Sequence, residues 1–282
     1  EQNLRRHFLV RLMLLIAAVA LLASGLVIRH NWQMEQVSLN EQATTWSREL
    51  RGDLDHMLAR EANGMRQTLQ VIGRDIALRN ALAQQDTVRL QADWMDTFRT
   101  LRTENDVTHF YFIGQDRTCL LRLHLPEQRG DRIDRRTMLE AERTGAPAWG
   151  LEMGKAGLLT LRVVQPIFDG ERRIGYVELG KEIEPLLAML HASGEHRYLY
   201  AVLLNKEAID RNSWESGMRL MGRQGDWEFL PRQVVAYRDP KLTPAALTFA
   251  NSQQATGSNQ TQIESEGRTI HLHADPLHVT GG

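Results

Sequence analysis

The chain has 282 residues and a formal net charge of -1, from 34 basic and 35 acidic side chains. A balance this close to neutral creates no overall field that would attract nucleic acid, which argues against nucleic acid as a partner. The single cysteine, Cys119, excludes an intrachain disulfide and the paired-cysteine motifs of zinc ribbons and attached c-type haem.

An uncharged apolar stretch at residues 12–28 is the first predicted element. At a helical rise of about 1.5 Å per residue it covers roughly 25 Å, and with the residues just before it approaches the ~30 Å hydrocarbon core of a bilayer. Arg5, Arg6 and Arg11 precede the stretch, whereas Arg29 alone follows it directly. Because basic flanks stay in the cytoplasm, the sequence predicts a single N-terminal membrane anchor with the remaining residues outside the cytoplasm.

A cleaved secretory signal is the main alternative for this stretch. Basic residues, apolar residues and then the small residues Ala20, Ala23, Ser24 and Gly25 also occur in that order in such signals. The apolar run, however, continues through residues 26–28 and exceeds the length of about 7 to 15 residues that is typical of signals. A buried core helix is disfavoured because the run has no polar face. An uncleaved anchor is therefore the favoured prediction.

Residues 31–105 have the composition of a long helix. They contain no proline, and their apolar side chains recur at spacings of mostly three and four, which forms a stripe along one side. The members of the stripe are Leu50, Leu54, Met57, Leu58, Met65, Leu69, Ile72 and Ile76. The sequence predicts a stalk with a break near residues 79–86 and a shorter helix that ends near Glu104. The stripe could pack on its own domain or on a second subunit, and a homodimer through this helix is the expected assembly.

From residue 106 onward the period changes from helical to strand-like, with alternating apolar residues and short turns. Asp134 is expected to cap a helix over residues 135–143, and a further helix is expected over residues 182–191. The predicted strands are residues 107–113, 118–124, 150–153, 158–168 and 173–180. This order predicts an α+β fold, in which a five-stranded antiparallel sheet is covered by helices and the long N-terminal helix covers one face.

A second, smaller α/β module is predicted after residue 193. Its expected elements are a strand at residues 198–204, a helix at residues 206–220 and a late strand at residues 269–273. The predicted domains are the cytoplasmic tip with the anchor at 1–30, the stalk at 31–105, the first module at 106–192 and the second module at 193–282.

Charged side chains lie in the middle of the predicted strands. Alternation places Arg122 and His124 on one face of their strand, and Cys119 on the opposite face as a small buried apolar residue. Two guanidinium groups can hold a carboxylate or phosphate through paired hydrogen bonds, so the expected partner is a small anionic molecule. The candidate ligand-binding residues are Tyr111, Arg122, His124, Asp131, Arg135, Glu152, Arg162, Tyr176 and Glu178.

The same charges have a purely structural interpretation. Arg162 could pair with Glu178 on an adjacent strand, and Arg122 could pair with Glu152, because a charge buried beneath helices must be compensated. The sequence leaves structural pairing and ligand binding open.

The sequence can also be searched for motifs of catalysis and of metal binding. The chain has no nucleophile-elbow, phosphate-loop, zinc-protease or dinucleotide-binding motif, which favours binding over catalysis. His271 and His273, with His278, form the histidine cluster, but no cysteine or clear carboxylate supplies a further ligand, so no metal and no cofactor are predicted.

Two functions of other classes stay open. One is an anchored extracytoplasmic enzyme whose acid and base are Glu152 and Glu178, or His124. The other is an adaptor that holds partners through the helical stripe.

Several short blocks in the first module occur together in a known family. They are His109-Phe110-Tyr111-Phe112-Ile113, Leu121-Arg122-Leu123-His124, residues 130–135 and 150–152, Leu161-Arg162-Val163-Val164-Gln165-Pro166, and residues 174–180. With these blocks the chain resembles the double Cache extracytoplasmic sensor domains of bacterial membrane receptors.

This resemblance implies a PAS-like sheet carried by a long helix, with a membrane-distal first module and a membrane-proximal second one. It implies a ligand-sensing front end in the bacterial inner membrane, with its bulk in the periplasm. It also implies an output such as a histidine kinase, a chemotaxis signalling region or a diguanylate cyclase. We therefore expect a truncated second module, with another membrane helix after Gly282.

Overall fold

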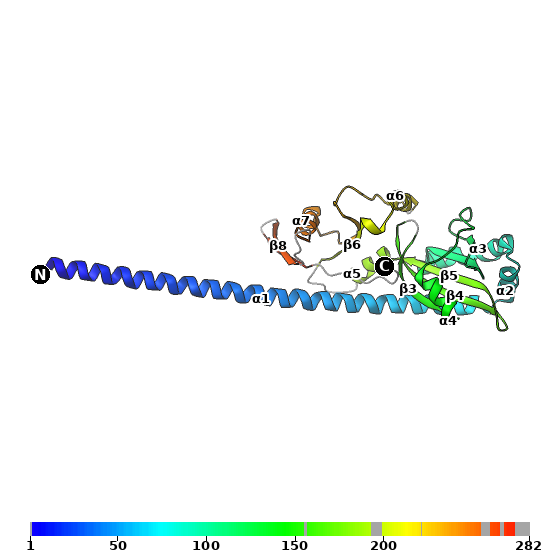
Figure 1. Cartoon of the computed structure of the whole chain (residues 1–282), viewed down its shortest axis with the longest axis horizontal. Coiled ribbons are helices and arrows are strands. Elements are labelled where there is room, and N and C mark those ends of the chain that lie inside the picture. The colour runs from blue at the N-terminus through cyan, green and yellow to red at the C-terminus, as the bar shows by residue number, and fades with distance from the viewer. Residues whose placement is uncertain are drawn as a thin grey trace.

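A single long helix, α1 (Gln2–Ile72), projects beyond the folded part of the molecule and also packs along it (Figure 1). The computed structural model describes residues 2–154, 157–192, 199–220, 222–254, 260–265 and 268–273. The other helices are α2 (Ile76–Ala83), α3 (Thr87–Asn105), α4 (Arg136–Thr144), α5 (Ile183–Ala192), α6 (Arg211–Leu220), α7 (Pro244–Gln254) and a short 3-10 turn, η1 (Lys206–Ala208). The strands are β1 (His109–Gly114), β2 (Cys119–Arg122), β3 (Ala148–Met153), β4 (Leu159–Asp169), β5 (Arg172–Glu182), β6 (Ala201–Asn205), β7 (Gln233–Arg238), β8 (Gln260–Ser265) and β9 (Arg268–His273).

The N-terminal part of α1 carries the apolar segment that the sequence predicts as an anchor. Among the described residues, Met13–Glu35 is the one segment long and apolar enough to cross a membrane, with a mean hydropathy of 2.0 and 0% of it buried. The helix passes the expected boundary at residue 30 without a break, because no proline removes a backbone hydrogen bond there. The predicted anchor and the first part of the stalk therefore form one continuous rod.

The apolar stripe of α1 packs on the sheet of its own chain. Leu69 is completely buried, and Met57 and Met65 are 4% and 3% exposed. These residues share one apolar core with Phe110 and Leu161 of the sheet. The sequence left open whether the stripe packs on its own domain or on a second subunit. In the structure it packs on its own domain.

The predicted break near residues 79–86 is confirmed at residues 84–86, and the shorter helix predicted to end near Glu104 is α3, but the chain also breaks earlier, between Ile72 and Ile76. α2 occupies part of the expected interruption, because Asp75 accepts a hydrogen bond from the backbone N–H of Leu78 at 2.7 Å and starts a new helix. Asp86 caps α3 in the same way, through the N–H of Arg89 at 3.0 Å. Ile76 is 67% exposed in α2, so its assignment to the stripe was wrong.

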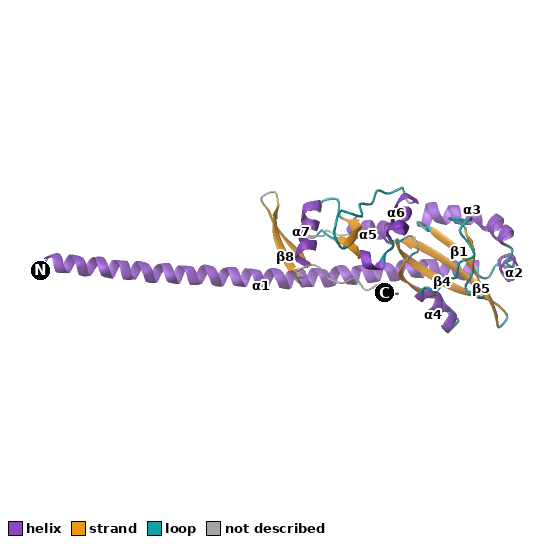
Figure 2. Ribbon diagram, turned by 45° about the horizontal axis from the view of Figure 1, so that its top comes forward, coloured by secondary structure: helices purple, strands orange, loops and turns teal. Residues whose placement is uncertain are grey.

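The central layer is a five-stranded antiparallel sheet with the strand order β2-β1-β5-β4-β3. One face packs against α1, α2 and α3 through an apolar core. The other face packs against α4 around a smaller core that includes Tyr111, Val164 and Tyr176. Figure 2 shows α3 and α4 on opposite sides of the strands. The α+β fold with helices on both faces is confirmed.

A bulge in the first hairpin changes which side chains share a face. Tyr111 lies opposite Arg122, but the register shifts after Phe112, and Ile113 lies opposite Cys119. An extra residue at a bulge reverses the alternation beyond it. Cys119 therefore lies in the same small core as Tyr111, and its predicted placement on the face away from Arg122 was wrong. It is 1% exposed, and burial raises the pKa of its thiol to about 11.

The second module contains two separate antiparallel pairs, β6 with β7 and β8 with β9. A single helix over residues 206–220 was predicted, but η1 and α6 divide that region because Asp210 accepts from the N–H of Ser213 at 2.8 Å and begins α6. Strands β7 and β8 and helix α7 were not predicted. Of the histidine cluster, His271 and His273 lie in β9, and His278 lies outside the described residues.

Candidate ligand-binding site

Three guanidinium groups surround the ring of Tyr111 on the α4 face of the sheet. The Cζ atoms of Arg122, Arg135 and Arg162 lie 5.1, 5.6 and 5.7 Å from the ring centroid. Arg122 comes from β2, Arg162 from β4, and Arg135 precedes the first residue of α4. Cations at this distance from an aromatic face are attracted by its negative π-cloud. Tyr111, on β1, is 5% exposed and forms the floor of this cluster.

Glu178 is the central carboxylate of the cluster. Arg135 Nη2 donates to its two oxygens at 2.6 and 2.5 Å, and Arg162 Nη1 donates to Oε1 at 2.7 Å. The side chains of Glu178 and Arg162 are 0% and 2% exposed. Burial opposes ionisation, but the charges of Arg135 and Arg162 outweigh it and hold the pKa of Glu178 below its ordinary value. The predicted pairing of Arg162 with Glu178 is confirmed.

Arg122 pairs with Asp131. Its Nη1 and Nη2 lie 2.8 Å from Oδ1 and Oδ2, a bidentate arrangement, and Nη1 also donates to the backbone carbonyl of Gln128. Both acceptors belong to the segment between β2 and α4, which folds back along the edge strand β2, where Cys119 N–H donates to the carbonyl of Asp131 at 2.8 Å. The alternative pairing of Arg122 with Glu152 was wrong.

Glu152 instead caps the N-terminus of α4. Its Oε1 accepts from the backbone N–H of Thr137 at 2.7 Å, and its Oε2 accepts from the Thr137 hydroxyl at 2.8 Å. This bond takes the place of the predicted cap by Asp134, which instead forms an ion pair with Arg117 at 3.2 Å. Glu152 also lies 3.5 Å from Arg135 Nε, so the cap and the cluster share one carboxylate.

Two histidines lie beside Tyr111. The ring centroids of His109 and His124 are 4.6 Å apart, and that of His124 is 5.0 Å from the Tyr111 ring. Burial and the charge of Arg162 lower the pKa of both, to about 3 for His124, so both rings are neutral at neutral pH. His109 was not among the predicted site residues. Alternation along β1 puts it on the same face as Tyr111, and that signal would have found it.

Tyr176 is the predicted site residue that the structure places apart from this cluster. It lies on the same face, but the Cζ of Arg173 is 5.1 Å from its ring centroid, and it packs in the small core with Val164. The other eight predicted residues lie in or next to the cluster.

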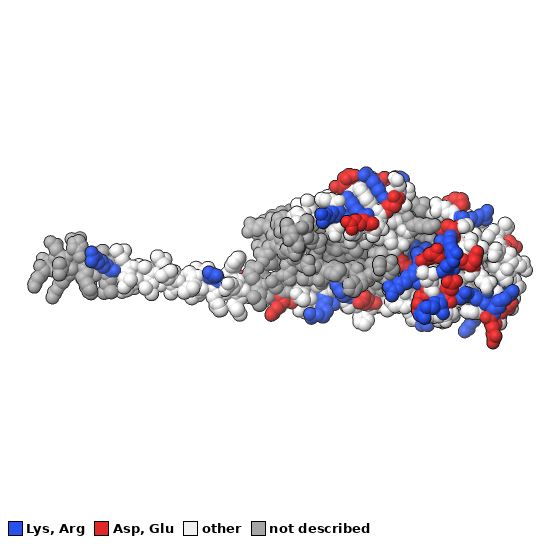
Figure 3. Space-filling view, in the orientation of Figure 1, with Lys and Arg blue, Asp and Glu red and all other residues white. Residues whose placement is uncertain are grey.

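The charges of the cluster cancel. Three guanidinium groups face three carboxylates, those of Asp131, Glu152 and Glu178, and the two histidines are neutral. Basic and acidic side chains are likewise interspersed on the visible surface of the folded part (Figure 3). A ligand that enters the cluster must therefore exchange partners with a group already there.

Comparisons with known proteins give one family. Residues 44–226 match the family described as the double sensory domain of two-component sensor kinase. No curated protein matches the chain.

Three solved structures illustrate the structural likeness. The sensor domain of E. coli DcuS is 20% identical, with 49% of this chain and 96% of that chain covered and a TM-score of 0.39. The periplasmic domain of Vibrio cholerae LuxQ is 16% identical, with 56% and 74% covered and a TM-score of 0.41. The ligand-binding domain of Mlp24 with asparagine is 13% identical, with 79% and 88% covered and a TM-score of 0.32.

Proposed function

Because the chain belongs to the family of double sensory domains of two-component sensor kinases, we propose that it forms the extracytoplasmic ligand-sensing part of a membrane receptor and binds a small anionic molecule around Tyr111. The family is a sensory one, and the charged residues of the cluster are assigned to binding. Glu152, Glu178 and His124 receive no catalytic role.

The Arg122–Asp131 pair is the observation that supports an anionic ligand. Asp131 is 26% exposed, whereas the side chains of Glu178 and Glu152 are 0% and 3% exposed. A carboxylate or phosphate that takes the place of Asp131 on Arg122 keeps the guanidinium compensated, and Asp131 is the most exposed of the three carboxylates and so the one nearest to solvent. Asp131 therefore stands in for the anionic group of the ligand.

Binding measurements on the full chain in lipid nanodiscs test this proposal. Acetate, succinate, citrate and inorganic phosphate, at matched ionic strength, separate carboxylate from phosphate ligands. At least one of them should raise the thermal midpoint, and titration calorimetry should give its affinity. If none binds, the anion site is wrong.

Two substitutions then locate the site. Arg122→Gln should weaken binding at least about tenfold, because a charge-assisted pair contributes about 1.5 to 3 kcal/mol. Asp131→Asn should tighten binding, because the competing carboxylate is gone. The control is Arg89→Gln, which removes a 52% exposed arginine paired with Asp93 on α3. Unchanged affinity in Arg122→Gln would contradict the assignment.

The anchor segment supports a route for the signal through the membrane. We place the N-terminus in the cytoplasm of a bacterial cell, the segment Met13–Glu35 in the inner membrane and the sensory modules in the periplasm. Ligand-dependent differences would pass along α1, which packs on the sheet with residues such as Leu69. In a Cys119→Ser background, Thr45→Cys should react with a membrane-impermeant maleimide in intact cells. Labelling only after permeabilisation would reverse the orientation.

A homodimer through α1 remains part of the proposal. Since the stripe is buried on its own domain, the interface must use another face, such as the apolar surface of the anchor, where Leu22 is 70% exposed. Leu22→Cys in the Cys119→Ser background should form a disulfide-linked dimer on mild oxidation in the membrane. A monomer under the same conditions would contradict it.

A further inference from the structure

Arg162 faces two glutamates on the neighbouring strand. In the register of β4 and β5 it lies opposite Gly180, and the residues two positions away on the same face of β5 are Glu178 and Glu182. Arg162 Nη1 donates to Glu178 at 2.7 Å, while its buried Nε has no hydrogen-bond partner among the described residues. On the neighbouring strand Arg162 therefore has its paired carboxylate, Glu178, on one side of Gly180 and a second carboxylate, Glu182, on the other.

Glu182 is a buried carboxylate that the candidate site does not use. Its side chain is 2% exposed, and neither oxygen accepts a hydrogen bond from a described residue. It forms a loose ion pair with Arg223, whose Nη1 lies 3.5 Å from Oε2. Burial raises the pKa of this carboxyl, and the positive charges of Arg223 and Arg162 oppose that increase. Glu182 is thus under-compensated for a buried acid.

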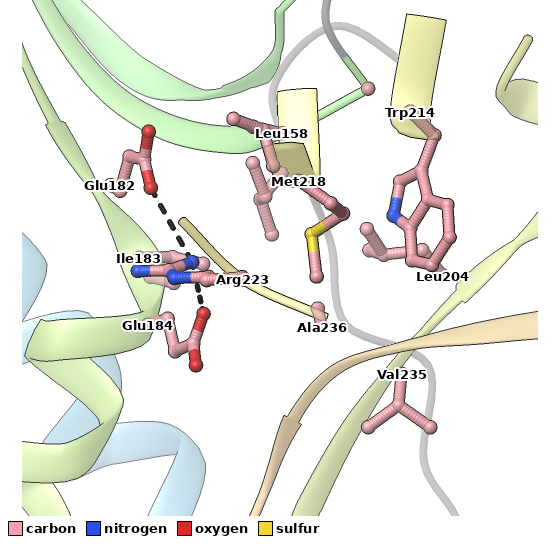
Figure 4. A pocket seen from close by; sticks show the side chains of 12 residues that line it. Leu158, Glu182, Ile183, Glu184, Leu204, Trp214, Met218, Arg223, Val235 and Ala236 are labelled. Atoms are coloured by element: carbon pink, nitrogen blue, oxygen red, sulfur yellow. Dashed lines mark ion pairs between the residues drawn. The ribbon is translucent and has the colours of Figure 1, made fainter. Parts of the chain in front are cut away.

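Arg223 connects the second module to the first. It follows α6, and its Nη1 also contacts Glu184, a 36% exposed residue at the start of α5. Figure 4 shows Arg223 between the two glutamates. These three residues line a pocket together with Trp214 and Met218, and its volume is about 20 Å³. A cavity of this volume holds about one water molecule, so there is room between the two modules for a small rotation of the Arg223 side chain.

We propose that Arg223, Glu182 and Glu184 form a latch between the two modules and that Arg162 couples this latch to ligand binding, an inference that rests on the proposed anion site. An anion that replaces Asp131 over the Tyr111 ring also attracts Arg162, whose Cζ lies 5.7 Å from the ring centroid, and so weakens its attraction for Glu182. Glu182 then depends more on Arg223, because a buried carboxylate without a counter-charge is unstable. The Arg223 side chain turns from Glu184 toward Glu182 and strengthens the contact between the two modules.

Reciprocity follows from this coupling. If anion binding strengthens the contact between Arg223 and Glu182, then that contact must strengthen anion binding by the same factor. The coupling can therefore be measured in two ways, as thermal stability without a ligand and as affinity for a ligand.

The first experiment is a mutant cycle on the ligand-free full chain in nanodiscs. Thermal unfolding of each variant is monitored by tryptophan fluorescence. Arg162→Met with Glu178→Gln imitates a neutralised Arg162 and removes both members of that pair. Arg223→Gln should lower the thermal midpoint by about 3 °C in the parent chain and by at least twice as much in this background.

The Glu182 and Glu184 variants give the matched comparison. With Glu182→Gln the extra loss should vanish, whereas with Glu184→Gln, which removes the exposed partner of Arg223, it should persist. Equal losses in every background overturn the coupling.

The second experiment measures succinate binding and does not need the Arg162 variant. Arg223→Gln should weaken succinate binding about fivefold in the parent chain and leave it unchanged with Glu182→Gln. Glu184→Gln should strengthen binding, because Arg223 is then available to Glu182. If succinate binds the parent chain but Arg223→Gln has no effect, the latch is wrong and the anion site stands. If no carboxylate or phosphate binds, the anion site is wrong, and the first experiment alone decides the latch.

Discussion

The two faces of the five-stranded sheet are both buried, but their chemistry differs. The face toward α1, α2 and α3 is mainly apolar, with Phe110 of β1 0% exposed, although Lys181 of β5 pairs with Glu61 of α1 there. The face toward α4 buries Arg162 and Glu178 at 1% and 0% exposure. Apolar burial stabilises by about 25 cal/mol per Å², whereas the desolvation of an ion pair offsets much of its attraction. One face therefore supplies most of the stability of the fold, while the other buries paired charges that contribute less.

Truncation on the apolar face should have the largest effect. Phe110→Ala removes a ring that packs edge-on against Phe98 and Trp94, with centroids 6.2 Å away in both cases. The expected loss is about 4 kcal/mol of unfolding free energy, measured by denaturant titration. Val88→Ala, at a 79% exposed position, is the control and should change stability by less than about 0.5 kcal/mol. A loss below about 1 kcal/mol for Phe110→Ala would contradict the assigned role of this face.

Removing one partner of a buried ion pair on the charged face should have the second largest effect on stability. Glu178→Ala leaves Arg162 buried without its carboxylate, and the expected loss is about 3 kcal/mol. Arg162→Met together with Glu178→Gln should be less harmful than Glu178→Ala alone, because no member of that pair is left unpaired. A double variant that is less stable than the single one would show that these charges hold the fold and would remove the contrast between the faces.

Acid should weaken the charged face before the apolar one. The pKa of His124 falls from 6.5 to about 3 on folding, so its contribution is complete above pH 6.5 and is lost as the pH falls toward 3. Between pH 7 and pH 5 this amounts to about 2 kcal/mol. His124→Gln should flatten that part of the pH profile, as measured by denaturant titration at each pH. An unchanged profile would mean that His124 does not couple protonation to folding.

The smallest effect is expected where the charged face meets solvent. Asp131→Asn should lower stability by about 1 kcal/mol or less, because its carboxylate is 26% exposed and water screens the pair with Arg122. The same variant is expected to bind the anion more tightly. A large loss of stability would show that Asp131 is a structural partner of Arg122 and is not a stand-in for the ligand.

The alternation of side chains along the strands predicts some of the ion pairs in the candidate site and misses others. The pairing of Arg162 with Glu178 follows from two adjacent strands with regular alternation, and it was predicted. The partner of Arg122 was not, because the segment after β2 folds back and brings Asp131 to it. Cys119 was placed on the wrong face because the bulge after Phe112 adds a residue that no pattern of apolar side chains reveals.

The sequence by itself determined the apolar N-terminal segment, the long helix and the strands of the α+β sheet, because these depend on local properties: an uncharged run, helical spacing and period-two alternation. Only the tertiary structure decided that the stripe of α1 packs on its own sheet, that Glu152 caps α4, and that Arg223 reaches Glu182 from the second module. These contacts join segments far apart in the chain. Their geometry depends on how the layers pack, since a charged side chain removed from water takes whichever counter-charge the fold brings within reach.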